Sequence, residues 1–236
     1  ELDFLKEKEV VLTFDDGPWL NNTPAVLKTL ADECTTGIFF TIGKHATYYP
    51  EIIKQVYAAG HTVGTHTWSH VALVNKKLSE DQRKEEIEKG ISAVKWALGG
   101  VSPAPFFRFP FLATSGPVIT YAKSRNIAIF QIDVDSKDYL TRDPKVVHAK
   151  IMSQLMAQRK GIILMHDIQP NTAKTLPALL TALKAGGYKV VHLKAKGKVQ
   201  TLADYDQLIE KDVKGLPAAG TEKPISSVIQ TVPNEQ

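Results

Sequence analysis

Short apolar runs alternate with amphipathic segments from the start of the chain to about residue 200, and this alternation constrains the fold more than any other feature. Seven runs have the length and composition of strands: 10–14, 37–42, 61–65, 105–109, 127–133, 161–165 and 188–193. Parallel strands need crossover connections, and strands buried on both faces read as continuous apolar runs. The pattern predicts an α/β fold, with a closed or nearly closed parallel (β/α) barrel as the first choice and an open doubly wound sheet as the alternative.

Several helix boundaries follow from local signals. Ser79 and Gln82 have the spacing of a capping box, and Gly99 and Gly100 follow the last apolar position of that helix. Pro50 is expected to open another helix. Further helix starts are expected at Thr23, Asp143, and Asn171 or Thr172.

Length and composition are those of one globular domain with a short tail. The 236 residues suffice for one barrel domain, expected over 1–214, followed by a Pro/Ser/Thr-rich tail over 215–236 that we expect to be extended or poorly ordered. Cys34 is the only cysteine, which excludes an internal disulfide and a Cys-rich metal cluster, and we expect it to be buried. The chain begins at Glu1 without a signal-peptide pattern, so we expect a processed or trimmed chain.

Charge and hydropathy narrow the range of partners. The net charge of +4 weakly favours polyanionic partners. The sequence contains no basic run with interleaved aromatic residues, so nucleic-acid binding is not expected. No apolar run approaches the ~18 residues of a membrane-spanning helix, so no membrane span is expected. No glycine-rich phosphate loop follows a strand, which counts against nucleotide binding. A monomer is expected.

Polar residues of catalytic type gather where the expected strands end. They are Asp15 and Asp16, His66 and His70, Arg108, Asp133 and Asp135, and His166. In a β/α barrel the C-terminal strand ends meet at one rim, where active sites lie. Five separate segments therefore predict one enzyme site.

His66 and His70 are four residues apart, so on one helical turn both rings can reach one metal ion. One acid of the Asp15–Asp16 pair can supply a third ligand, and two imidazoles with one carboxylate form a recognised catalytic metal set. Zinc is the first expectation, with cobalt or nickel as alternatives and non-haem iron as a competitor. The structural alternatives are a simple Asp-Gly-Pro turn and two spare histidines.

The other polar residues supply the remaining parts of a hydrolase. The acid that does not bind metal can act as a base, and His166 as the acid, with Asp135 expected to orient the imidazole. Arg108 lies among phenylalanines and is expected to pair with a carboxylate, most usefully the base. Alternatively, His166 is a rim histidine, Asp135 caps a loop and Arg108 extends to the surface.

With these residues in place, the chain resembles the polysaccharide deacetylases, the NodB-homology group of carbohydrate esterase family 4. The resemblance covers about residues 9–195 and five ordered motifs: TFDDG at 13–17, HTWSH at 66–70, RFPF at 108–111, DSKDY at 135–139 and LMH at 164–166. It implies a distorted (β/α) barrel. Family members are mostly secreted, periplasmic or attached to the cell surface, and the resemblance implies the same here.

The resemblance also implies individual roles. Asp15 would be the base, Asp16, His66 and His70 the metal ligands, and His166 the acid. Arg108 would contact the base, the backbone N–H of Phe111 would bind the oxyanion, and Leu164 would line the acetyl-methyl pocket. Phe111 stands where the family usually has Tyr, and Tyr139 where it commonly has Trp. Tyr139, Trp68 and Trp19 lie close to the motifs and are candidates for stacking on sugar rings.

The implied activity is metal-dependent removal of N-acetyl groups from acetylated amino-sugar polymers or oligomers, such as chitin, chitooligosaccharides or peptidoglycan, with release of acetate. Alternatives are an O-acetyl xylan esterase using the same site, a hydrolase of small cyclic amides, a carbohydrate-binding pseudoenzyme and an iron oxygenase.

Overall fold

The computed structural model describes residues 4–214, and its centre is a sheet of eight strands in which every pairing is parallel. The strands are β1 (Glu9–Asp15), β2 (Ile38–Thr41), β3 (Thr62–Thr65), β4 (Phe106–Phe107), β5 (Ala128–Ile129), β6 (Val134–Asp135), β7 (Gly161–His166) and β8 (Lys189–Val190). Their order is β5-β4-β3-β2-β1-β7-β6, with β8 paired to the start of β1. Each of the seven expected runs contains a strand, and β6 is the one strand that was not expected.

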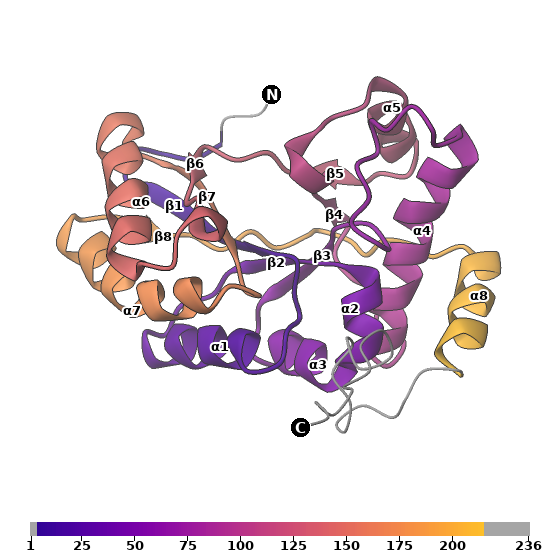
Figure 1. Ribbon diagram of the computed structural model, residues 1–236, viewed down its shortest axis with the longest axis horizontal. Coiled ribbons are helices and arrows are strands. Elements are labelled where there is room, and N and C mark those ends of the chain that lie inside the picture. The colour runs from indigo at the N-terminus through magenta and orange to yellow at the C-terminus, as the bar shows by residue number, and fades with distance from the viewer. Residues whose placement is uncertain (1–3, 215–236) are drawn as a thin grey trace, which may run out of the picture.

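Helices surround the sheet (Figure 1). They are α1 (Asn22–Asp32), α2 (Gly43–Tyr48), α3 (Pro50–Ala58), α4 (Glu80–Ala97), α5 (Gly116–Ser124), α6 (Pro144–Gln158), α7 (Pro170–Ala185) and α8 (Ala203–Val213). α7 packs against α1 and α6, and α4 packs against α2 and α8. No helix of residues 4–214 is long and apolar enough to cross a membrane.

The core lies on both faces of the sheet, as the continuous apolar runs predict. Val10, Leu12 and Phe14 of β1 pack outward against the helices, whereas Val11 faces an inner cluster that includes Phe40. The barrel lacks the hydrogen-bonded ladder between β5 and β6 that would close a regular one. Phe130 N–H donates to Phe107 O (2.8 Å) and Asp133 N–H donates to Ile162 O (3.0 Å), so residues 130–133 cross from β4 to β7. This crossing segment, in place of a hydrogen-bonded ladder between β5 and β6, makes the expected barrel a distorted one.

Most local signals are confirmed. Ser79 and Gln82 form the capping box of α4, Pro50 opens α3, and the Asp143 side chain caps α6.

Three local expectations are wrong. α1 begins after Asn21, and Thr23 uses its hydroxyl in a long-range contact instead of a cap. α7 begins at Pro170, so neither Asn171 nor Thr172 caps it. Cys34 is exposed, because it lies in the turn after α1. The expected tail, 215–236, lies outside the described residues.

Candidate active site

The two adjacent acids at the end of β1 have different partners. Asp16 adopts a left-handed conformation (φ 76°), so its side chain leaves the strand in a different direction from that of Asp15. Asp15 Oδ1 accepts a hydrogen bond from Arg108 Nη1 at 2.7 Å. Asp16 Oδ1 lies 3.4 Å from His66 Nε2 and 3.3 Å from His70 Nε2. The like charges are therefore compensated separately.

Asp16, His66 and His70 form a group that fits a metal ion. Their ligand atoms all lie within 4.8 Å of one another. Asp16 Oδ1 is buried and accepts no hydrogen bond in the described part of the chain, although both imidazoles are close to it. Such an orphaned carboxylate oxygen is costly unless a cation meets it. A divalent ion would satisfy it.

The two histidines are held in the form that binds metals. His66 Nδ1 lies 2.7 Å from Arg108 O, which leaves Nε2 for a ligand. Burial lowers the pKa of His66 and of His70, which favours neutral imidazoles. The expected helical turn is wrong: both residues lie in an irregular loop after β3, where His70 has φ 62°. The rings nevertheless reach the same point, with centroids 4.9 Å apart.

Arg108 follows β4 and is fully buried, so the surface alternative does not apply. Its guanidinium donates to Asp15 Oδ1, to Thr13 Oγ1 (2.8 Å) and to Gln131 O (3.3 Å), and it stacks 4.2 Å from the ring centroid of Phe40. A planar group with this many fixed contacts holds the Asp15 carboxylate in one orientation.

His166, at the end of β7, has a buried carboxylate partner. Its Nδ1–H donates to Asp138 Oδ1 at 2.7 Å, and its backbone N–H donates to Asp138 Oδ2 at 2.7 Å. Thr172 Oγ1 also donates to Asp138. Burial lowers the pKa of His166, but the hydrogen bond and charge of Asp138 outweigh it and raise the pKa to about 9. The imidazole is therefore protonated near neutral pH, with Nε2–H free to donate.

The expectation that Asp135 orients His166 is wrong, because Asp138 does so. Asp135 pairs in β6 with Leu164 of β7, and its carboxylate accepts from Lys137 N–H (3.0 Å) and Lys137 Nζ (2.5 Å). Lys137 has φ 53°, and this left-handed conformation turns the chain so that the Asp138 carboxylate contacts the imidazole of His166.

Of the four residues expected to contact substrate, two expose their rings, one is buried and one packs against helices. Phe111 (68% exposed) packs its ring 4.7 Å from that of His70, and Tyr139 (48% exposed) presents its ring edge to His166 at 5.5 Å. Leu164 is buried in β7. Trp68 instead packs close to Gly43 of α2 and lies under Lys89 Nζ of α4 (4.5 Å), which is the structural alternative for this residue.

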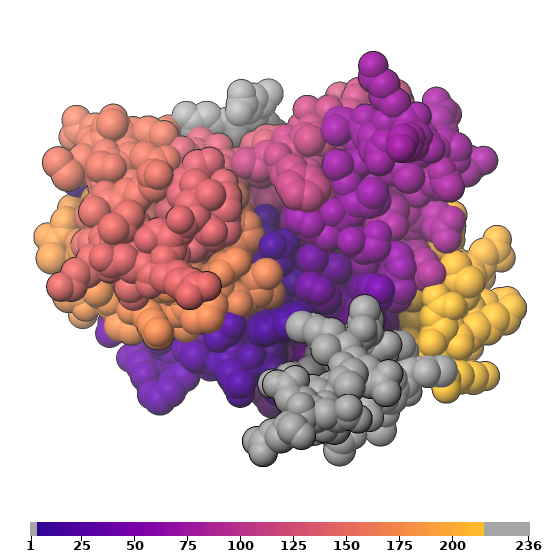
Figure 2. All heavy atoms as spheres, viewed as in Figure 1, coloured from indigo at the N-terminus to yellow at the C-terminus, as the bar shows by residue number. Residues whose placement is uncertain are grey.

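One face of the molecule is hollowed. Figure 2 shows a depression between the salmon and orange part of the chain, which includes α6 and α7, and the purple part, which includes α4, with the indigo N-terminal part at its floor. The C-terminal ends of β1, β3, β4 and β7 carry the polar residues described above.

Two side chains beside the site were missed, one buried and one partly buried. Asp167 accepts from Gly17 N–H (3.0 Å) and Thr23 Oγ1 (2.5 Å), and burial raises its pKa to about 7. A Cβ on Gly17 would lie 2.0 Å from Asp167 Oδ2, so the loop after β1 rests directly on this carboxyl group. His45 Nδ1 lies 2.6 Å from Asp16 O. The polar pair His166–Asp167 was a usable signal for Asp167, whereas nothing in the spacing of His45 pointed to Asp16.

Fold and site together define a (β/α)-barrel protein with a two-histidine, one-carboxylate metal group, flanked by an Asp–Arg pair and a protonated His–Asp pair. The chain belongs to the polysaccharide deacetylase family, whose family model matches residues 4–130.

Individual relatives agree with this assignment. The peptidoglycan-N-acetylglucosamine deacetylase PgdA of Listeria monocytogenes is 35% identical over 184 residues, which are 78% of this chain and 38% of that protein. The chitooligosaccharide deacetylase of Azorhizobium caulinodans is 29% identical over 201 residues, 77% of this chain and 91% of that protein. The structure of the peptidoglycan deacetylase Bd3279 of Bdellovibrio bacteriovorus superposes with a TM-score of 0.75 at 35% identity, covering 82% of this chain and 54% of that one. The chain thus spans well under two thirds of the Listeria protein.

Proposed function

We propose that residues 1–214 form the catalytic domain of a metal-dependent hydrolase that removes N-acetyl groups from acetylated amino-sugar polymers or oligomers and releases acetate. The observation that carries the proposal is that a fixed carboxylate, Asp15, and an imidazole with a raised pKa, His166, are partners in the β1–β7 ladder, beside the residue that holds the orphaned Asp16 oxygen. The printed activities of the Listeria and Azorhizobium relatives support this class of substrate.

Asp16, His66 and His70 would hold the metal ion. Nitrogen and carboxylate donors in this number suit zinc first, and cobalt or nickel suit the same donors. When bound, such an ion polarises a carbonyl oxygen and lowers the pKa of water.

The protein's own residues then divide the proton transfers. Asp15, held by Arg108, takes a proton from the attacking water as the water oxygen bonds to the acetyl carbon. The Phe111 backbone N–H donates to the developing oxyanion. His166 gives its Nε2 proton to the leaving nitrogen as the carbon–nitrogen bond breaks, and Asp138 stabilises the imidazolium until then. The products are acetate and a free amine.

Substrate recognition would use apolar surfaces at the same rim. Leu164 would contact the acetyl methyl group, and the exposed rings of Phe111 and Tyr139 would stack on sugar faces. Since the Listeria and Bdellovibrio relatives are named as peptidoglycan deacetylases, we also propose a secreted, periplasmic or cell-surface location.

The test is acetate release from chitopentaose and from peptidoglycan, before and after chelation and after addition of zinc, cobalt or nickel. Asp15→Asn should abolish release, whereas Asp135→Asn, which changes a carboxylate bound to Lys137, should retain it. Activity in chelated protein or in Asp15→Asn would refute the proposal. Release from acetylated xylan alone would assign the site to an O-acetyl esterase.

A further inference from the structure

The loop after β3 delivers both histidines of the metal group (Asp16, His66 and His70), but it holds them differently. The His66 N–H donates to Thr41 O (2.9 Å), and its imidazole Nδ1 lies 2.7 Å from Arg108 O. The His70 side chain is 26% exposed, and its imidazole forms no hydrogen bond within residues 4–214. A metal-binding histidine is ordinarily oriented through its second ring nitrogen. The orientation of His70 must therefore come from the backbone of the loop.

α4 holds this loop immediately before His70. Glu86 Oε2 accepts a hydrogen bond from the Ser69 N–H (2.9 Å), and Glu86 Oε1 accepts one from Ser69 Oγ (2.8 Å). One residue earlier in the loop, the Trp68 N–H donates to Glu86 O at 2.7 Å. One glutamate thus accepts three hydrogen bonds from two consecutive residues of the loop, and both oxygens of its carboxylate are used for them.

Other residues of α4 lie against the same loop. A Cβ on Gly90 would lie 2.7 Å from Thr67 C and 2.9 Å from Thr67 O, so a side chain at this position would displace the loop. On the other side of His70, Arg83 Nε donates to Leu73 O at 2.8 Å. The helix therefore contacts the loop both before and after the histidine.

Two residues of the loop have left-handed backbone conformations, with φ 64° at Thr67 and φ 62° at His70. Non-glycine residues keep such conformations only where the surrounding structure fixes them. The His70 N–H donates to Thr67 Oγ1 (3.0 Å), which closes the turn internally but does not attach it to the rest of the protein. The side chain that attaches the turn just before His70 is that of Glu86.

We propose that Glu86 is a positioning residue that sets the orientation of His70 in the metal group. The inference rests on the proposed function, since it takes Asp16 and the two histidines as metal ligands. Removing the carboxylate would free the Ser69 amide and hydroxyl, so His70 would adopt further orientations, whereas His66 would keep its own contacts. Loss of a group that orients a metal ligand reduces metal affinity by roughly tenfold to hundredfold.

The experiment measures the zinc affinity of the full chain with a competing chelator. Glu86→Ala should weaken zinc binding by about tenfold or more. Glu86→Gln should stay within about threefold of wild type, because its amide oxygen accepts from the Ser69 N–H and its amide nitrogen donates to Ser69 Oγ. The matched control Glu85→Ala removes an exposed carboxylate from the neighbouring position of α4 and should change the affinity less than twofold.

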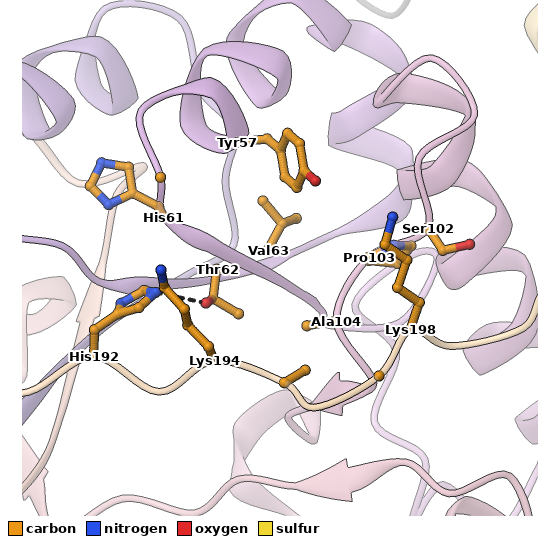
Figure 3. Close-up of a pocket in the computed structure, with 13 residues that line it drawn as sticks. Tyr57, His61, Thr62, Val63, Ser102, Pro103, Ala104, His192, Lys194 and Lys198 are labelled. Atoms are coloured by element: carbon orange, nitrogen blue, oxygen red, sulfur yellow. Dashed lines mark hydrogen bonds between the residues drawn. The ribbon is translucent and has the colours of Figure 1, made fainter.

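A second control separates positioning of the loop from general weakening of β3. Figure 3 shows Thr62 at the N-terminal end of this strand, in the wall of a cavity of about 390 Å³, with its contact to His192 dashed. The Thr62 hydroxyl also donates to Leu193 O at 2.9 Å. Thr62→Val removes both contacts, so it should lower the free energy of unfolding in urea while changing the zinc affinity less than twofold.

Metal-free protein provides a readout that does not depend on zinc. In Glu86→Ala the Ser69 amide should exchange faster with solvent, because its acceptor is gone. The NMR signals of the His70 imidazole should change more than those of the His66 imidazole. In Glu86→Gln both measurements should resemble those of the wild type.

Each other outcome overturns the inference. Unchanged zinc affinity in Glu86→Ala, an equal loss in Thr62→Val, or unchanged His70 signals in metal-free protein would show that Glu86 does not position this ligand. An equal loss in Glu86→Gln would assign the effect to the charge of Glu86 instead of its contacts. Failure of the wild type to bind zinc would refute the metal group itself, and the proposed function with it.

Discussion

Replacing Asp138 by Asn is expected to move the titration of His166 across neutral pH. Asp138 is the principal group that raises the pKa of this imidazole from 6.5 to about 9, against the opposing effect of burial. The net shift of about 2.5 pH units corresponds to roughly 3.4 kcal/mol at 1.36 kcal/mol per unit. Without the carboxylate, burial remains, so the pKa should fall to about 6.5 or below. At pH 7.5 the protonated fraction would fall from about 97% to about 9%, a tenfold loss of the proposed acid.

The assay follows the His166 imidazole by NMR in metal-free protein and then the pH dependence of acetate release in the metal-loaded enzyme. The alkaline limb of kcat/KM should move toward acid by two units or more in Asp138→Asn. Asp135→Asn is the matched control, since it neutralises a nearby carboxylate that contacts Lys137 and not His166. A His166 pKa that stays near 9 in Asp138→Asn, or that falls equally in both variants, would refute the reasoning.

Further predictions follow from the same contacts. His70→Ala should remove a ligand of the proposed metal group and reduce zinc binding by at least tenfold, measured with a competing chelator. Gly17→Ala should lower stability by roughly 1–3 kcal/mol in urea unfolding because its Cβ would meet the Asp167 carboxyl, whereas Gly116→Ala, with open space around it, should be nearly neutral. Arg108→Met should cost about 3–5 kcal/mol, since it leaves Asp15 buried without its partner. Because the pKa of His166 is raised in the folded protein, its protonation should stabilise the fold fully below about pH 6.5, and this contribution should be lost as the pH rises through about 9. The difference in the free energy of unfolding between wild type and Asp138→Asn should therefore narrow between about pH 6.5 and 9.

The strand pattern and most of the residues at the rim could be predicted from the sequence, because both depend on local signals. A strand buried on both faces leaves a continuous apolar run, and a polar residue at its end is conspicuous, as Asp15, Asp16 and His166 are. The assignment of Asp135 failed for a local reason as well. Which acid of DSKDY meets His166 depends on a left-handed backbone at Lys137, a residue type that does not signal such a conformation as Gly or Asn would.

Contacts between residues far apart in the chain could not be predicted from the sequence. Asp167 lies 150 residues from Gly17 in the sequence, and only the parallel pairing of β1 with β7 brings the two together. The same pairing places Asp15 beside His166, since the two are partners in the ladder. A single sequence shows that both strands end in polar residues, but the register that makes those ends neighbours is a property of the folded sheet.

The backbone around the site departs from the preferred conformations of its residues, and this departure explains how the side chains converge. Asp16, Thr67, His70, Phe111 and Lys137 all have positive φ, and they lie in the segments that follow β1, β3, β4 and β6. Each such conformation costs a non-glycine residue roughly 1–2 kcal/mol. Glycine would remove that cost, but it would also remove the ligand or ring that the turn delivers at three of these positions. The buried sheet on both sides of β1 must therefore stabilise the loops, and mutations that loosen it should weaken metal binding before they unfold the protein.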